Sequence, residues 1–205
     1  RDVAPSRGLG DVYKRQVSGC AFPALQSEES SFCFLPIFWN YGGSLAQIDS
    51  PAGRQAFGFL KQLAENKALS EDNVNMTISD IAWEFANGNI AMAFLTSGYE
   101  NEIREENPDL HFATTKLPCG ENSITISGGE VLTVTCAEHE KEAREFVRFM
   151  EQPEQTEVYL DSMGYLAARR DLLKKQIQTD PAKKTYWSYL KQAKFREIEP
   201  YWPSL

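Results

Sequence analysis

The chain of 205 residues is long enough for one large domain or two small lobes, and it carries a formal net charge of −8 with a pI near 4.9. A hydrophobic fraction of 42% and an aromatic fraction of 12% are typical of a folded globular protein and not of a disordered one. The acidic balance argues against nucleic-acid binding, which depends on Lys and Arg side chains that neutralise phosphates, and no apolar run approaches the ~18 residues of a membrane helix.

The first segment, residues 1–16, is polar and precedes the sequence VSGC at Val17–Cys20. VSGC has the form of a bacterial lipoprotein cleavage site, but Asp11 and Lys14 interrupt the apolar stretch of about 7–15 residues that a signal peptide needs. Residues 11–16 can instead be encoded by GAT GTG TAT AAG AGA CAG, which resembles the mosaic end of transposase-based sequencing libraries. We therefore expect residues 1–16 to be a disordered adaptor scar, with a natural polar tail as the alternative, and the true N-terminus to be missing.

Short apolar segments and helices alternate in the next part of the chain. Residues 20–23 and 90–94 are short, apolar and predicted to be strands. Residues 32–39 (FCFLPIFW) are also apolar, but Pro36 lacks the backbone donor that a central strand needs. An aromatic-rich helix or an irregular segment is therefore predicted there.

Two helices are predicted between these apolar segments. The first begins at Ser50-Pro51, a favoured N-cap and first-turn pair, and its apolar stripe is expected to be buried: Ala56, Phe57, Leu60, Leu63 and Ala64. The second begins near Ser79 or Asp80 and ends at Asn87-Gly88, since glycine commonly terminates helices. Its expected buried residues are Ile81, Ala82 and Phe85. Trp83, like Phe57, lies on a helical stripe and is expected in the core.

Downstream, a short charged helix is predicted over residues 100–106, because Asn107-Pro108 disfavours its continuation. Residues 112–117 and 131–135 are predicted strands on their β-branched and apolar content. Helical spacing of apolar residues predicts a helix over residues 139–150 (HEKEAREFVRFM).

Two further helices are predicted near the end of the chain. One begins at Pro153 and ends at Gly164. The other is capped by Asp180-Pro181 and carries Trp187, which is expected to pack in the core. Together the elements predict a mixed α/β chain.

Side chains for metal or nucleophilic chemistry are sparse. The four cysteines, Cys20, Cys33, Cys119 and Cys136, form no CxxC pair, and His111 and His139 share no ligand spacing with them. Cys33 and Cys136 are expected to be small core residues, and both histidines to lie on the surface. The sequence contains no GxSxG, Walker or HExxH motif. We therefore expect no metal, no cofactor and no catalytic residue.

Several segments share an order with one known family. The stretch FANGNIAMAFLTSGYE (85–100) resembles a signature of the bacterial family 1 extracellular solute-binding proteins, the maltose-binding-protein-like sugar receptors of ABC transporters; Tyr99 stands where that family usually has Trp. Other segments resemble the family in the same order: FLPIFWNYGGSL, Leu117-Pro118, ISGGEVLTVT, KEAREFVRFM with Pro153-Glu154-Gln155, MGYLAARRDLL and PYWPSL. In MGYLAARRDLL, Ala167 replaces the usual Pro. VSGC falls at an interior position of this pattern, so its likeness to a cleavage site is interpreted as coincidence.

The resemblance implies an α/β, two-lobed periplasmic-binding-protein fold of type II, incomplete because the N-terminal part and the C-terminal end are missing. Residues 17–107 would belong to the second lobe, residues 108–160 would return to the first, and residues 161–205 would complete the truncated second lobe. The lobes of such a fold close on ligand by hinge motion.

The resemblance also implies a function. The protein would be the substrate-binding component of an ABC importer, would bind a mono- or oligosaccharide in the interlobe cleft, and would deliver it to the membrane permease subunits. It would act as a monomer on the extracellular side of the bacterial membrane, periplasmic or lipid-anchored, with no nucleic-acid partner. Two alternatives stay open: a carbohydrate-active enzyme, and a non-catalytic structural or interaction module.

Candidate ligand residues follow from the chemistry of sugars, which present apolar C–H faces and a rim of hydroxyls to aromatic rings and polar groups. The candidate aromatic residues lie near element ends beside Gly or Pro, where sites are favoured over cores: Trp39, Tyr41, Tyr99, Tyr165, Tyr201 and Trp202. Ordinary packing is the alternative for each. Glu130 follows Gly128-Gly129 and heads a predicted buried strand, where a carboxylate needs a partner. We expect it to accept hydrogen bonds from sugar hydroxyls; a strand-end contact with water or Arg is the alternative.

Overall fold

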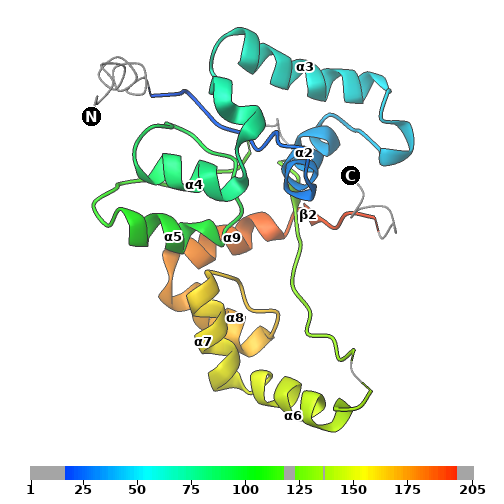
Figure 1. The fold of residues 1–205 in the computed structure, drawn as a ribbon, viewed down its shortest axis with the longest axis vertical. Coiled ribbons are helices and arrows are strands. Elements are labelled where there is room, and N and C mark those ends of the chain that lie inside the picture. Colours follow the sequence, from blue (N-terminus) through cyan, green and yellow to red (C-terminus); the bar gives the residue numbers. More distant parts are fainter. Residues whose placement is uncertain (1–16, 118–122, 136, 198–205) are drawn as a thin grey trace, which may run out of the picture.

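The computed structural model describes residues 17–117, 123–135 and 137–197 (Figure 1). The elements are α2 (Glu28–Asn40), η1 (Leu45–Gln47), α3 (Pro51–Glu65), η2 (Glu71–Asn75), α4 (Ile78–Ala86), α5 (Tyr99–Glu106), β1 (Thr125–Ile126), α6 (Glu140–Met150), α7 (Pro153–Met163), α8 (Arg170–Thr179), α9 (Pro181–Leu190) and β2 (Ala193–Lys194). Helices α2–α5 gather at one end of an elongated molecule, α6 lies at the other end, and α9 lies between the two (Figure 1).

Helix ends follow the local sequence signals. Ser50 caps α3 by accepting a hydrogen bond from the Gly53 N–H at 3.3 Å, and Asp180 caps α9 by accepting from the Ala182 N–H at 2.8 Å. Helix α4 begins slightly earlier than predicted, because Thr77 and Asp80 form a capping box. Helix α7 ends at Gly164 in the left-handed region, with φ of 69°. These starts and ends confirm the predicted helices.

The apolar segment 32–39 lies within helix α2. Pro36 stands inside this helix, and Leu35, Ile37 and Phe38 around it are buried. An interior proline removes one backbone donor, yet the helix is apolar over much of its surface and is held by burial on several sides. The helical alternative of the prediction is therefore the correct one.

The predicted strands are the largest departure. Residues 20–23 and 90–94 form only isolated parallel bridges, Ala21 with Ala93 and Ser18 with Ile90, while Cys20 bridges Leu69. The strands predicted over 112–117 and 131–135 are wrong, since both segments are irregular. Apolar content alone forms no strand without a partner for its backbone groups, and neither segment pairs with a strand within the described part of the chain. The two-residue strands β1 and β2 pair in parallel and were too short to predict.

The core lies among α2, α3, α4 and α5. Phe38, Ile37 and Cys33 belong to the largest cluster, and Ile81 and Ile103 belong to two smaller clusters beside it. The burial of Cys33 confirms its prediction, and Cys136 lies outside the described residues. Cys20 is also buried.

Three aromatic residues depart from the predicted core. Phe57 and Trp83 were predicted to be buried and are exposed. Trp187, also predicted in the core, is only half-buried. The apolar stripes of α3 and α4 are wider than the surface that covers them, so Phe57 and Trp83 at their margins stay exposed. The Phe57 ring nevertheless stacks on Phe34, with ring centroids 4.5 Å apart.

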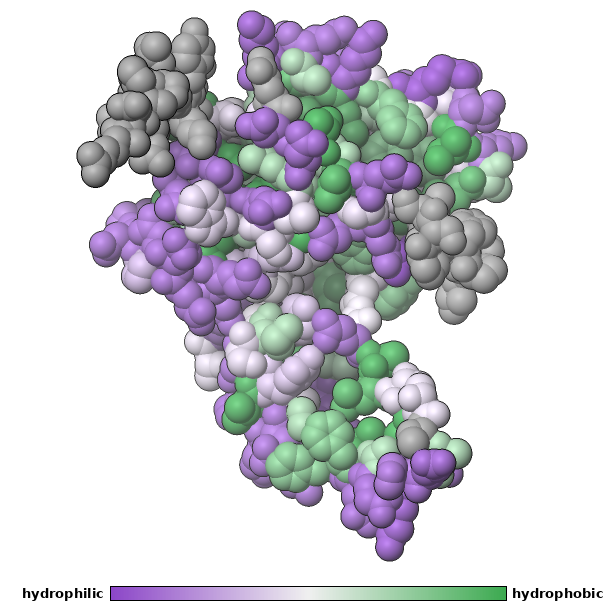
Figure 2. All heavy atoms as spheres, viewed as in Figure 1, coloured by the Kyte–Doolittle hydropathy of each residue, from purple (hydrophilic) through white to green (hydrophobic). Residues whose placement is uncertain are grey.

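The opposite end of the molecule has no such core. No described residue between 128 and 163 is buried. Helix α6 forms as predicted, but Phe146 and Phe149 are exposed, and apolar atoms come to the surface over this end in Figure 2. None of the described helices has the length and apolar content to cross a bilayer.

Candidate functional site

Glu130 lies where side chains from distant parts of the sequence meet. Its carboxylate accepts hydrogen bonds from the Tyr159 hydroxyl at 2.8 Å and the Tyr165 hydroxyl at 3.3 Å. The segment that carries Glu130 is exposed and irregular, not the buried strand that was predicted. Two tyrosine hydroxyls, and not an arginine, therefore pair with this carboxylate.

The end of helix α7 determines the position of Tyr165. Gly164 adopts a left-handed conformation that glycine tolerates, and the Tyr165 N–H donates to Leu160 O at 3.0 Å. On the other side, a Cβ atom at Gly98 would lie 2.7 Å from Tyr165 Cε1. The absence of a side chain at Gly98 thus makes room for the Tyr165 ring.

Tyr99 begins helix α5 directly after Gly98. Its ring packs against the largest core cluster, and its hydroxyl is 3.0 Å from Ser79 Oγ of α4. Burial raises the pKa of Tyr99. Tyr99 is thus a half-buried residue beside the Gly98–Tyr165 contact, tied to α4 by its hydroxyl.

The electrostatics of the cluster centre on Glu130. The hydrogen bond to Glu130 raises the pKa of Tyr159. Burial raises the pKa of Tyr165, with a further contribution from the charge of Glu130. Both phenols therefore remain neutral hydrogen-bond donors well above neutral pH.

Trp39 and Tyr41 lie at the end of helix α2. Trp39 is buried in the largest core cluster, with Lys194 Nζ 5.9 Å from its ring centroid, and Tyr41 is exposed. The hydrogen bonds to Glu130 come from Tyr159 and Tyr165 and from neither of these two residues. Tyr201 and Trp202 lie outside the described residues. The structure therefore brings together Glu130, Tyr165 and Tyr99 from the predicted set.

Sequence reasoning missed two residues of this region. Asn40 exchanges two hydrogen bonds with Ile124, of 2.7 and 2.8 Å, and so fixes the end of α2 to the segment that leads to Glu130. Tyr159 was also missed. Its position on α7, about one and a half turns before Tyr165, could have indicated that the two tyrosines lie near each other. An asparagine at a helix end carries no such signal, because its partner is 84 residues away.

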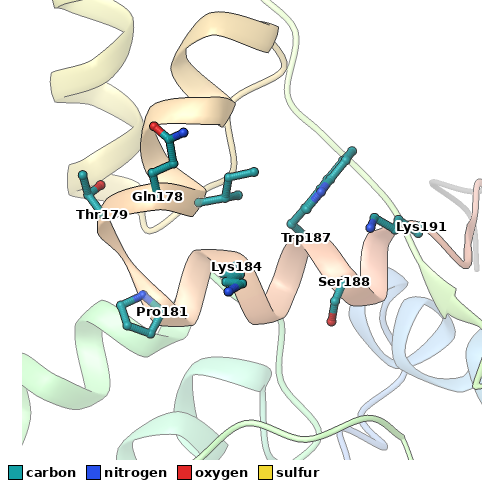
Figure 3. Close-up of a pocket in the computed structure, with 8 residues that line it drawn as sticks. Gln178, Thr179, Pro181, Lys184, Trp187, Ser188 and Lys191 are labelled. Carbon is teal, nitrogen blue, oxygen red and sulfur yellow. The ribbon is translucent and has the colours of Figure 1, made fainter.

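A separate cavity of about 600 Å³ lies between α8 and α9 (Figure 3). Ile177, Thr179, Pro181 and Trp187 are among its lining residues, and none of the predicted ligand residues lines it. Across the described ranges, no group of three His, Cys, Asp or Glu side chains is placed to hold a metal ion.

Comparison with curated proteins finds distant relatives. A binding protein of Brucella abortus (strain 2308) is 20% identical over 187 residues, which cover 86% of this chain and 46% of the relative. A binding protein of Brucella suis biovar 1 (strain 1330) matches to the same extent. The chain thus spans about half the length of the curated relatives it matches.

Solved structures share the fold. Maltose-bound MalE3 of T. maritima superposes with a TM-score of 0.72 at 17% identity, over 94% of this chain and 52% of that one. A protein described as an oligosaccharide periplasmic-binding protein from Synechococcus sp. MITs9220 gives a TM-score of 0.63 at 16% identity, over 95% of this chain and 55% of that one. These likenesses confirm the predicted periplasmic-binding-protein fold.

A family match completes the comparison. The sequence pattern described as bacterial extracellular solute-binding protein matches residues 9–185. The match overlaps the end of the segment predicted to be an adaptor scar, which lies outside the described residues, and that prediction stays untested. The match covers most of the chain and agrees with the resemblance found in its motifs. The chain belongs to the bacterial extracellular solute-binding protein family.

Proposed function

We propose that this protein binds a mono- or oligosaccharide and that Glu130, Tyr165 and Tyr99 form part of the ligand site. The observation that carries the proposal is the Glu130 carboxylate, held by two tyrosine hydroxyls beside the aromatic rings of Tyr165 and Tyr99. A carboxylate offers about four lone-pair sites, so two remain for sugar hydroxyls. Aromatic faces beside a polar acceptor suit the apolar faces and hydroxyl rim of a pyranose.

The remaining predicted ligand residues keep this role as part of the proposal. Trp39, Tyr41, Tyr201 and Trp202 would extend the aromatic surface. Trp39 is buried in the core, so its contribution would be smaller than that of the exposed Tyr41.

The cellular role in the proposal follows from the family. The protein would deliver its ligand to the permease subunits of an ABC importer, as a monomer on the extracellular side of the membrane. The similar proteins are named as binding proteins, which supports a non-catalytic role over a carbohydrate-active enzyme or a structural module.

The proposed division into lobes has support from the burial pattern. Residues 17–107 contain the three core clusters, and α9 reaches them through the hydrogen bond between Tyr186 and Glu100. The stretch 108–160 contains no buried described residue. This contrast supports the assignment of residues 17–107 and 161–205 to one lobe. For the stretch 108–160 it supports the other lobe only from about residue 128 on, since Ile124 and Ile126 pack on the largest core cluster and β1 pairs with β2.

Calorimetric titration of the full-length protein with glucose, xylose, maltose and cellobiose tests the function. We expect saturable binding of at least one sugar, and Glu130→Gln should weaken it by about ten- to a hundredfold, because a charge-assisted hydrogen bond contributes about 1.5–3 kcal/mol. Glu138→Gln is the matched control, since it removes an exposed carboxylate farther along the same segment.

The outcomes separate the site from the function. Unchanged affinity in Glu130→Gln, or a loss matched by general unfolding, removes Glu130 from the site. A folded wild-type protein that binds no sugar of a widened panel, including oligosaccharides of other linkages, contradicts the sugar proposal.

A further inference from the structure

The last turn of α7 and the segment that connects it to α8, together residues 161–169, are held by polar side chains from α5, α8 and α9. Asn101 of α5 donates from Nδ2 to Asp161 O at 2.7 Å. Gln176 of α8 donates to Tyr165 O at 3.2 Å and accepts from the Ala167 N–H at 2.9 Å. Lys183 of α9 donates from Nζ to Gly164 O. We call Asn101, Gln176 and Lys183 the polar clamp.

Two members of the polar clamp are buried at a free-energy cost. Gln176 is 7% exposed and Lys183 is 8% exposed, and a buried ammonium needs compensation for its lost hydration. Burial lowers the pKa of Lys183, while the nearby carboxylates of Asp180, Glu100 and Asp161 oppose that change. These carboxylates therefore offset part of the cost of burying the Lys183 side chain on the Gly164 carbonyl.

Termination of helix α7 does not by itself account for the polar clamp. The left-handed Gly164 already allows its own N–H to donate to Asp161 O, at 3.3 Å, and the Tyr165 N–H to donate to Leu160 O. Such a glycine end suffices for many helices. The clamp bonds instead fix the carbonyls of Asp161, Gly164 and Tyr165, and so hold the backbone on both sides of Tyr165. What they add is a defined direction for the Tyr165 ring.

We propose that Asn101, Gln176 and Lys183 are positioning residues that hold Tyr165 against Gly98 and beside Glu130 before any ligand binds. This inference rests on the proposed function, because it assigns the clamp to the proposed sugar site. A preformed site needs its ligand-contacting groups held within about 0.5 Å by residues that are themselves locked in place. The clamp meets that need from three helices, so the ring is directed without a ligand.

The test compares Lys183→Met with Lys184→Met in the full-length protein. Lys184 is the next residue of α9 and is exposed, so its replacement removes the same charge from the same helix without touching Gly164 O. The first measurement is the pKa of Tyr165 in unliganded protein, by NMR of ring-labelled tyrosine assigned with Tyr165→Phe. We expect Lys183→Met to lower this pKa toward the ordinary value of about 10, because the ring moves away from Glu130 and into water.

The sign of this change excludes a simple charge effect. Loss of a nearby positive charge alone would raise a phenol pKa, whereas displacement of the ring lowers it. Lys184→Met should leave the pKa of Tyr165 unchanged. The second measurement is affinity for the tightest-binding sugar among glucose, xylose, maltose and cellobiose, which should fall about tenfold in Lys183→Met and stay unchanged in Lys184→Met.

Each outcome decides the proposal. A folded Lys183→Met protein with the wild-type Tyr165 pKa overturns the positioning role, whatever happens to affinity. If Lys183→Met does not fold, Asn101→Ala carries the same two measurements with the same expected directions. If wild-type protein binds none of the sugars, the proposed function fails, and the Tyr165 titration alone still confirms or overturns the positioning role.

Discussion

Residues 17–107 and residues 128–163 use the same kinds of helix with different results. In the first region, helix α2 buries Phe38 completely, and α4 buries Ile81. In the second, helix α6 has an apolar stripe at clear helical spacing, yet Phe146 is 56% exposed. The second region extends away from the first along an irregular segment (Figure 1).

This contrast separates helix formation from helix burial. Spacing and end signals suffice for α6 to form, because its backbone hydrogen bonds are internal. Burial needs a second apolar surface, and α2 finds one on α3. The described part of the chain offers α6 little beyond its contacts with α7. The same helical spacing of apolar residues therefore gives a buried helix where a second apolar surface covers it, and an exposed apolar helix where none does.

The largest expected effect tests this contrast with matched substitutions in the 205-residue chain. Phe38→Ala should lower the free energy of unfolding by about 3–5 kcal/mol, because it leaves a cavity in the core. Phe146→Ala should change it by less than about 0.5 kcal/mol, because the ring is exposed. Denaturant unfolding followed by circular dichroism measures both, and a comparable cost at Phe146 would show that α6 is covered.

A second pair of substitutions tests the contact between Gly98, in the first region, and Tyr165, which lies just after the second region. Gly98→Ala should destabilise the protein by about 1–3 kcal/mol through overpacking, since its Cβ would lie 2.7 Å from Tyr165 Cε1 and 3.3 Å from Met163 O. Gly129→Ala should stay within about 0.5 kcal/mol, because no atom lies within 4 Å of its Cβ. Thermal unfolding compares them, and equal effects would argue against the Gly98–Tyr165 contact.

Hydrogen exchange should reveal the contrast without a mutation. Backbone amides of α6 should exchange at least about tenfold faster than those of α4, a difference of about 1.4 kcal/mol in opening free energy. The reason is that α4 packs Ile81 and Ala82 into the core, while α6 buries no residue. Mass spectrometry of peptides from the 205-residue chain measures both helices in one experiment. Equal protection would contradict the proposed difference.

The smallest expected effect concerns the ion pair at the start of α8. Arg169 pairs with Asp171 at 2.8 Å and also donates to Glu151 O at 3.0 Å, and so connects α8 to the end of α6. The Arg169 hydrogen bond lowers the pKa of Asp171 to about 2. Since the folded pKa is below the ordinary value of about 3.9, this stabilisation is present above that value and is lost as pH falls toward 2.

Asp171→Asn removes this carboxylate. Because the pair is exposed, the melting temperature at neutral pH should fall by less than in Phe38→Ala and Gly98→Ala. The difference from wild type should shrink further in the acid range, as the wild-type carboxylate becomes protonated. Calorimetry at pH 7 and pH 3 measures this trend, and a difference that grows toward acid would contradict the assigned pKa direction.

The sequence by itself determined most of the helices and several of their ends, although α8 was not predicted and α2 was one of two alternatives. Ser50, Asp180 and Gly164 act within one or two turns of chain, so their capping and terminating roles can be read from neighbouring residues. The motifs in their order from residue 34 to residue 205 also sufficed to recognise the family. Glu130 and Tyr165 were selected because glycines precede them, and the structure joins them by a hydrogen bond; their ligand role stays a prediction.

Only the tertiary structure decided which surfaces are buried and which distant groups meet. Phe57 and Trp83 have the spacing of core residues, but spacing specifies a face and not what covers it. The strand predicted at residues 131–135 has suitable residues and lacks a pairing partner among the described residues. The bonds from Asn40 to Ile124 and from Lys183 to Gly164 O join residues far apart in sequence, and their geometry depends on how several helices pack together. Local backbone preferences act over a few residues, whereas burial and polar pairing depend on contacts that exist only once the chain has folded.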